Sequence, residues 1–369
     1  MLDGIRGHFA LVPDHRADNA SYKLKDLLTI SLLAACCGLD GFDEYEDFIA
    51  ERAETLATLL PEDGRTPCAM TFGRVFAAMD RQGFKTAFRA ATADIDRTID
   101  RILACDGKTS RGSADPDTGS DPLHTVSVWG HETRMVLAQI AVDEKSNEIP
   151  ALRELLSLFD LEGRIVVADA MHTQRETCGL IVGKGGDYLL PVKENQKTLL
   201  EDVVRFFADH ADASSDTHET VDSDHGRLET RTATSLPWVG RLKSHAWPGL
   251  AGVGRIHRTV AKDGRTSRET AWFLMSKPWT AKQPNHIARA EWSIESLLHW
   301  RLDVLFEEDD SRVRKDNAAE NLTVLRHLAL NFLSKRVVPG NRRMTMRRRM
   351  RQALLNPSKM LDLVSGRAA

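Results

Sequence analysis

The order of apolar patterns between residues 102 and 193 constrains the fold more than any other feature of the chain. Two runs of strand character, 123–130 and 134–144, flank a short connection and predict an antiparallel hairpin. A helix pattern over 147–161 then precedes a strand pattern over 164–170, and another helix and strand follow. A hairpin followed by this alternation predicts an α/β fold, with a mixed sheet and helices packed on it.

The segments outside this core differ in character. Residues 22–101 have helical periodicity, whereas residues 199–282 are polar with aromatic and β-branched fragments and predict a mostly β insertion. A further helix pattern begins near Asn285, which could cap it, and a last one follows it. We therefore expect an N-terminal helical domain (1–100), a core (101–335) containing the insertion (199–282), and a basic C-terminal tail (336–369).

Charge is unevenly distributed along the chain. The net charge is −3, but the 17 residues from 335 to 351 hold eight Lys or Arg and no acid. This segment is a candidate for contact with phosphates, the alternative being a solvated tail. Its candidate residues are Arg342, Arg343, Arg347, Arg348 and Arg349.

Apolar runs and cysteines favour a cytoplasmic protein. The longest apolar run, 27–39, is too short to span a bilayer, so no membrane partner is expected. The five cysteines form neither a disulfide framework nor a metal-finger spacing.

Three acids stand out as candidates for a metal site. Asp106 and Asp169 each follow a strand pattern, Gly107 after the first allows a turn, and the two could face each other across adjacent strands. Glu295 lies on the late helix, in a polar arc with Glu291 and His299. Converging carboxylates repel one another, and a divalent cation such as Mg²⁺ resolves that repulsion. The alternative interpretations are a turn at Asp106, a helix cap at Asp169 and a solvated side chain at Glu295.

Other polar residues are candidates for contact with nucleic acid, with ordinary surface positions as the alternative. They are Lys108, Arg111, Lys193, Asn195, Gln196, His225, Arg227 and Arg231. Trp292 and Trp300 could stack on an extrahelical base, although core packing is the simpler expectation for both.

Several sequence blocks together resemble the bacterial insertion-sequence DDE transposases, in the group that contains the H-repeat-associated proteins. The blocks occur in the family's order, and they are "CDGKTSRGS", "EKSNEIPALRELL", "IVVADAMHTQ", "GGDYLLPVKENQ", "HGRLETR" and "WSIESLLHWRLDVLFEED". The resemblance implies a ribonuclease-H-like core with a β-rich insertion between the second and third acids. It also implies that Asp106, Asp169 and Glu295 are the catalytic metal ligands. Ser296 and Glu291 depart from the family pattern, which leaves Glu291, Asp303 and Glu308 as alternative third acids.

The resemblance further implies the reaction and its partners. We expect a transposase that uses two Mg²⁺ or Mn²⁺ ions to cleave double-stranded DNA at terminal inverted repeats and to join the ends to a target. A homodimer on DNA, DNA-end binding by the N-terminal helices and a bacterial, nucleoid-associated location are expected with it. The alternatives are a transposase-derived DNA-binding protein without catalysis and a metal-dependent nuclease that does not join strands.

Overall fold

The computed structural model describes residues 2–17, 19–142, 147–210, 216–224, 226–237, 239–334 and 344–365. No helix among these residues is long and apolar enough to cross a membrane. His225, Arg342 and Arg343, three of the expected DNA contacts, lie outside the described residues.

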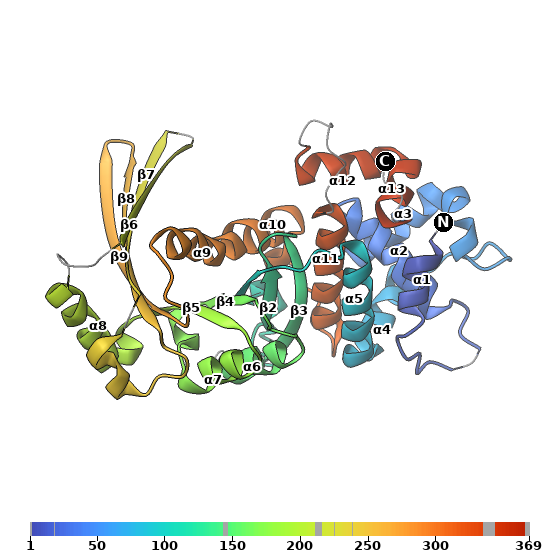
Figure 1. The fold of residues 1–369 in the computed structure, drawn as a ribbon. Helices are drawn as coiled ribbons and strands as arrows, with labels where there is room; N and C mark the ends of the chain where they lie inside the picture. The colour runs from blue at the N-terminus through green and yellow to red at the C-terminus, as the bar shows by residue number, and fades with distance from the viewer. Residues whose placement is uncertain are drawn as a thin grey trace.

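A sheet in the strand order β3-β2-β1-β4-β5-β9-β8-β7-β6 forms the centre of the molecule (Figure 1). β2 is antiparallel to β1 and β3, β4 is parallel to β1 and β5, and β5 is antiparallel to β9. The predicted hairpin and the predicted mixed α/β sheet are therefore confirmed. The first five strands are β1 (Ile102–Thr109), β2 (His124–Gly130), β3 (Met135–Val142), β4 (Ile165–Ala168) and β5 (Asp187–Val192).

The insertion adds four long antiparallel strands to the same sheet, and their hairpins extend beyond it (Figure 1). They are β6 (Asp216–Asp224), β7 (Arg227–Leu236), β8 (Gly252–Lys262) and β9 (Arg265–Met275). The insertion begins differently from the expectation, because α8 (Lys197–His210) is an amphipathic helix that buries Leu199, Val203, Phe206 and Phe207. These apolar residues recur at three- and four-residue steps, which places them on one face of the helix.

Helices cover both faces of the sheet, and side chains of β1 alternate between them. Leu103 and Cys105 join the core under α6 (Glu148–Ser157) and α7 (Arg175–Gly183). Ile102 and Ala104 join the other core, which also includes residues of α9 (Lys282–Ser293) and α10 (Trp300–Leu305). A π-helical turn, η7 (Ile294–His299), connects α9 to α10, so the predicted helix is continuous. It begins before Asn285, which is buried rather than capping.

The N-terminal helices pack around α11 (Ala318–Ser334), whose residues are almost all buried (Figure 1). α11 also contacts β3, so the helical part and the sheet share one continuous core. The N-terminal helices are α1 (Asp3–Phe9), α2 (Leu24–Cys36), α3 (Phe42–Leu56), α4 (Ala69–Ala78) and α5 (Arg81–Ile95). Short 3₁₀ turns are η1 (Ala57–Leu59), η2 (Arg111–Ser113), η4 (Ala170–His172), η5 (Glu194–Gln196), η6 (Gly240–His245) and η8 (Glu308–Asp310).

The basic C-terminal segment is helical where the structure describes it. α12 (Met346–Leu355) and α13 (Pro357–Ser365) pack on one another and against α11, with α13 also contacting α1 and α2. Met350 and Ala353 are buried in this contact, whereas Arg347 and Arg348 are exposed. Arg349 donates to the carbonyl of Leu333. The segment is thus anchored by its apolar face and presents part of its basic face to solvent.

Candidate functional site

Strand register places the first two candidate acids side by side. β1 and β4 are parallel with Cys105 opposite Ala168, so Asp106 lies at the next position of β1 and Asp169 directly follows the end of β4. Because side chains alternate along a strand, both point to the face that α9 covers. The expectation that Asp106 ends its strand is wrong, since β1 continues to Thr109 and Asp106 pairs with Ser127 of β2.

Gly107 does not turn the chain either, because it lies inside β1. A Cβ atom at this position would lie 2.6 Å from Nε2 of His124 and 2.7 Å from Oε2 of Glu148. Those distances are shorter than real Cβ contacts, so any other residue here would force the buried side chains of His124 and Glu148 to move.

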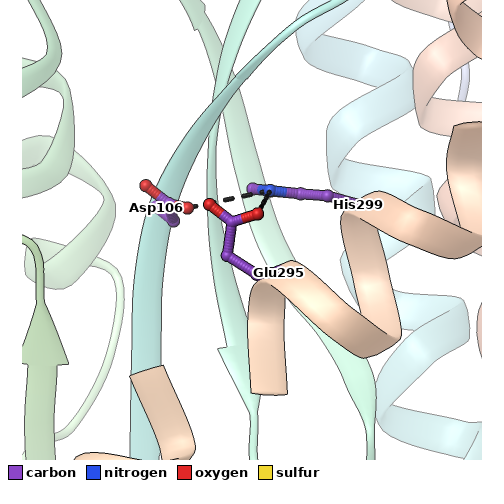
Figure 2. A group of neighbouring side chains, drawn as sticks. All are labelled: Asp106, Glu295 and His299. Atoms are coloured by element: carbon purple, nitrogen blue, oxygen red, sulfur yellow. Dashed lines mark ion pairs between the residues drawn. The ribbon is translucent and has the colours of Figure 1, made fainter. Parts of the chain in front are cut away.

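The third acid reaches the site from the helix above the sheet. Figure 2 shows Glu295 and His299, both in η7, pointing toward Asp106 of β1. Nδ1 of His299 lies 3.7 Å from Oδ2 of Asp106 and 3.9 Å from Oε2 of Glu295. One ligand atom from each of the three residues lies within 4.8 Å of the others. This spacing is compatible with a bound cation, and π turns of this kind are frequent at functional sites.

Burial and crowding shift the protonation of the site. Burial raises the pKa of Asp106 to about 7, with Glu295, Glu148 and Asp169 adding to the effect against a hydrogen bond from the Gly107 amide. Burial and the charge of Asp169 raise the pKa of Glu291 to about 8. Burial and Lys108 lower the pKa of His299 to about 4, so its imidazole is neutral at pH 7. A cation among these groups would favour ionised carboxylates.

Asp169 is not a member of the cluster formed by Asp106, Glu295 and His299. Its Oδ1 instead accepts a bond of 2.9 Å from Nζ of Lys193. Partial burial raises the pKa of Asp169, but the Lys193 ammonium, the Ala170 backbone N–H and His172 together outweigh burial and hold that pKa below its ordinary value. The structure therefore brings Asp106 and Glu295 together, and holds Asp169 at the end of the neighbouring strand with a lysine as partner.

Comparison with known proteins identifies the family. Residues 72–332 match the family model of the transposase DDE domain, and residues 6–91 match a model described as associated with it. The chain belongs to the DDE transposase family. This confirms the resemblance that the sequence blocks carried. A DDE domain implies use of a divalent metal ion, and Asp106, Glu295 and His299 offer ligand atoms for one.

Relatives from bacteria match most of this transposase. YhhI of Escherichia coli K12, an H repeat-associated protein provisionally named a transposase, is 30% identical over 99% of this chain and 98% of its own length. YncI of Escherichia coli O157:H7, also provisionally named a transposase, is 34% identical over 90% of this chain and 87% of its own length. An uncharacterised protein from the dhlA 3′ region of Xanthobacter autotrophicus is 37% identical over 75% and 95%.

A solved structure of the piggyBac transposase synaptic complex with hairpin DNA covers 99% of this chain and 77% of that chain. Its TM-score is 0.47 at 10% identity, which is too low to carry a conclusion about this transposase.

Asn195 and Gln196, which the sequence offered as DNA contacts, instead hydrogen-bond to the loop that follows Asp169. The amide of Asn195 donates to the carbonyl of Ala170 at 2.7 Å, and that of Gln196 donates to the carbonyl of Thr173 at 3.2 Å. Their amide nitrogens are therefore bonded within the transposase fold, although Asn195 remains exposed. Lys193 keeps a side chain that is 64% exposed beside Asp169.

Lys108, the expected phosphate contact after the first acid, is instead 11% exposed and surrounded by carboxylates. Its Nζ lies 2.7 Å from Asp303, 3.4 Å from Glu308 and 3.3 Å from Asp309. Asp303 and Glu308 are thus already paired with a cation, which disfavours both as the third acid. Arg111 is 83% exposed, with Nε 3.7 Å from Asp309.

The arginines of "HGRLETR" bind within the insertion. Arg227 and Arg231 both pair with Glu229, and Arg231 is 7% exposed. The guanidinium of Arg231 lies 4.4 Å from the ring centre of Trp292, and that of Arg258 lies 3.6 Å from it. The expectation that Arg231 contacts DNA therefore conflicts with its burial, and Trp292 binds arginines in place of an apolar core.

Sequence reasoning named Glu291 only as an alternative third acid, and it did not assign His299, His124, Glu148 or His172 to the site. The spacing of Glu291, Glu295 and His299 along one helix face carried a signal for Glu291 and His299. No local pattern links His124, Glu148 and His172, because they come from β2, α6 and η4. Trp300, in contrast to the core expectation, is 53% exposed.

Proposed function

We propose that this protein is a metal-dependent DNA transposase that cleaves insertion-sequence ends and joins them to target DNA. The observation that carries the proposal is the convergence of Asp106 and Glu295, with Asp169 at the end of the adjacent strand, in a chain of the DDE transposase family. Carboxylates from strands and a helix that meet beside an exposed surface are suited to phosphoryl transfer with divalent cations.

The same proposal includes a ribonuclease-H-like core with the β-rich insertion between the second and third acids. The order β3-β2-β1-β4-β5, with β2 antiparallel between β1 and β3 and with β1, β4 and β5 parallel, supports this core. The insertion strands lie between Asp169 and Glu295 in the chain, as such an arrangement requires.

Asp106, Asp169 and Glu295 would hold two Mg²⁺ or Mn²⁺ ions, which supply Lewis-acid activation of a water or a 3′-hydroxyl and stabilise the leaving oxygen. Glu295 is 71% exposed, so its carboxylate can adjust to a ligand. The neutral imidazole of His299 lies 3.7 Å from Asp106 and 3.9 Å from Glu295, where it could serve as a further ligand. Glu291, beside Asp169, is a further carboxylate at the site.

Double-stranded DNA is the proposed partner, both as terminal repeats and as target. Lys193, Arg111, Arg347 and Arg348 have exposed side chains that could contact phosphates. His225, Arg227, Arg342, Arg343 and Arg349 remain in the same proposal, as does DNA-end binding by the N-terminal helices. Two ends must be held together, so a homodimer on nucleoid DNA in a bacterial cytoplasm is expected.

The test uses purified full-length protein and DNA carrying the inverted repeats that flank its gene. With Mn²⁺ or Mg²⁺ we expect nicking at the repeat ends and joined products, both abolished by a chelator and by Asp106→Asn. Asp263→Asn, at the exposed tip of the β8–β9 hairpin, is the matched control and should retain activity.

The alternative functions give different products. Cleavage without joined strands would indicate a nuclease, and binding without cleavage would indicate a DNA-binding protein. Metal-independent cleavage, or equal activity in Asp106→Asn, would refute the proposed mechanism.

A further inference from the structure

A chain of buried polar side chains lies under the site, on the opposite face of the sheet. Oε1 of Glu148 is 2.8 Å from Nε2 of His124, whose Nδ1 is 2.7 Å from Oγ1 of Thr109. Oε2 of the same carboxylate is 3.7 Å from Nε2 of His172. Glu148, His124 and His172 are 2%, 5% and 0% exposed, so these three residues of the network are enclosed, while Thr109 is half-buried at its edge.

Burying a carboxylate is costly unless charge and hydrogen bonds compensate it. Glu148 begins α6, where the helix dipole favours an anion, and two imidazoles face its oxygens. Burial raises its pKa, but the two histidines outweigh burial and lower that pKa to about 2. The carboxylate is therefore anionic at neutral pH.

The network touches both segments that carry the aspartates. On one side, Glu148 and His124 lie against Gly107, the residue after Asp106, so closely that a Cβ atom would overlap them. On the other side, His172 ends the short turn η4 that follows Asp169, and its backbone N–H donates to the Asp169 carbonyl at 2.9 Å. A single carboxylate thus spans β1 and the loop after β4.

We propose that the Glu148 network is a positioning device that fixes the Asp106 strand and the Asp169 loop relative to each other, and so sets the affinity of the site for a divalent cation. This rests on the proposed metal-dependent function. Residues that orient metal ligands without touching the metal commonly change metal affinity by about 10- to 100-fold when replaced. A network that only stabilised the fold would change melting temperature and leave that affinity unaltered.

The experiment compares Glu148→Gln with Glu154→Gln, an exposed acid on the same helix α6. Mn²⁺ binding to the full-length protein, measured by calorimetry without DNA, should weaken about 10-fold or more in Glu148→Gln and stay at the wild-type value in Glu154→Gln. Wild-type Mn²⁺ affinity in a cooperatively melting Glu148→Gln protein would overturn the inference. If Glu148→Gln does not fold, His172→Gln replaces it. This variant alters only the contact with the turn after Asp169, and its Mn²⁺ affinity should also fall about 10-fold or more.

A second measurement separates this inference from the proposed function. Amide hydrogen exchange over residues 169–174 should be faster in Glu148→Gln than in Glu154→Gln, and unchanged exchange would count against the positioning role. If the wild-type protein binds Mn²⁺ but does not cleave DNA, the proposed function is refuted. The comparison of Mn²⁺ affinity between Glu148→Gln and Glu154→Gln still tests the positioning role. If the wild type binds no Mn²⁺, the metal mechanism fails and the exchange result alone decides the positioning role.

Discussion

Replacing Asp106 by Asn should stabilise the metal-free protein while removing metal binding. The pKa of Asp106 is about 7 in the folded protein against an ordinary value of 3.8, chiefly because the carboxyl is buried among other acids. A raised folded-state pKa means that ionisation opposes folding, so wild-type stability falls as pH rises from about 4 to 7. At about 1.4 kcal/mol per pKa unit, the upper limit of this cost at pH 8 is about 4 kcal/mol.

The assay is urea unfolding in the presence of a chelator at pH 5 and pH 8. Asp106→Asn should exceed wild type by about 1–4 kcal/mol at pH 8, and by less than about half as much at pH 5, where the carboxyl is mostly protonated in the folded state but ionised in the unfolded chain. Asp263→Asn, far from the site, should match wild type at both values of pH. Added Mn²⁺ should stabilise wild type but not Asp106→Asn. A variant no more stable than wild type at pH 8, or a gain equal at both pH values, would refute the electrostatic reasoning.

Three further substitutions test neighbouring contacts. Gly107→Ala should destabilise the protein by about 2 kcal/mol in chemical unfolding, because its Cβ atom would lie 2.6 Å from Nε2 of His124. Lys193→Gln should raise the pKa of Asp169, because the Lys193 ammonium lowers it. The same substitution should weaken DNA binding more at low salt than at high salt. Arg231→Met should lower the melting temperature, because it leaves Glu229 and Trp292 with one fewer partner, without changing the salt dependence of DNA binding; a lower salt slope would show that Arg231 contacts phosphates.

Strand patterns allowed more of the site to be predicted than helix patterns did. Apolar runs located β4 and β5 closely, and parallel neighbours made it reasonable to expect Asp106 and Asp169 on adjacent strands. The end of β1 was misplaced because Asp-Gly is a common turn signal, whereas this glycine is required by the side chains packed on it. Local sequence cannot reveal such a long-range packing constraint.

Helix periodicity identified a polar face but could not rank its members. Glu291, Glu295 and Asp303 are all acids on the same helical segment, and their roles depend on what lies opposite each one. Lys108 is opposite Asp303, Asp106 is opposite Glu295, and Asp169 acts on Glu291. These partners come from other strands, so their assignment needed the tertiary structure.

The insertion takes part in this arrangement through ion pairs and cation–π contacts rather than through an exposed basic surface alone. Arg231 of β7 and Arg258 of β8 share Glu229 and lie against the ring of Trp292, which directly follows Glu291 in α9. Guanidinium groups near an aromatic ring and shared with a carboxylate hold that ring more firmly than apolar contact alone. The position of α9, and with it the approach of Glu291 and Glu295 to the two aspartates, therefore depends on strands that begin more than 40 residues after Asp169.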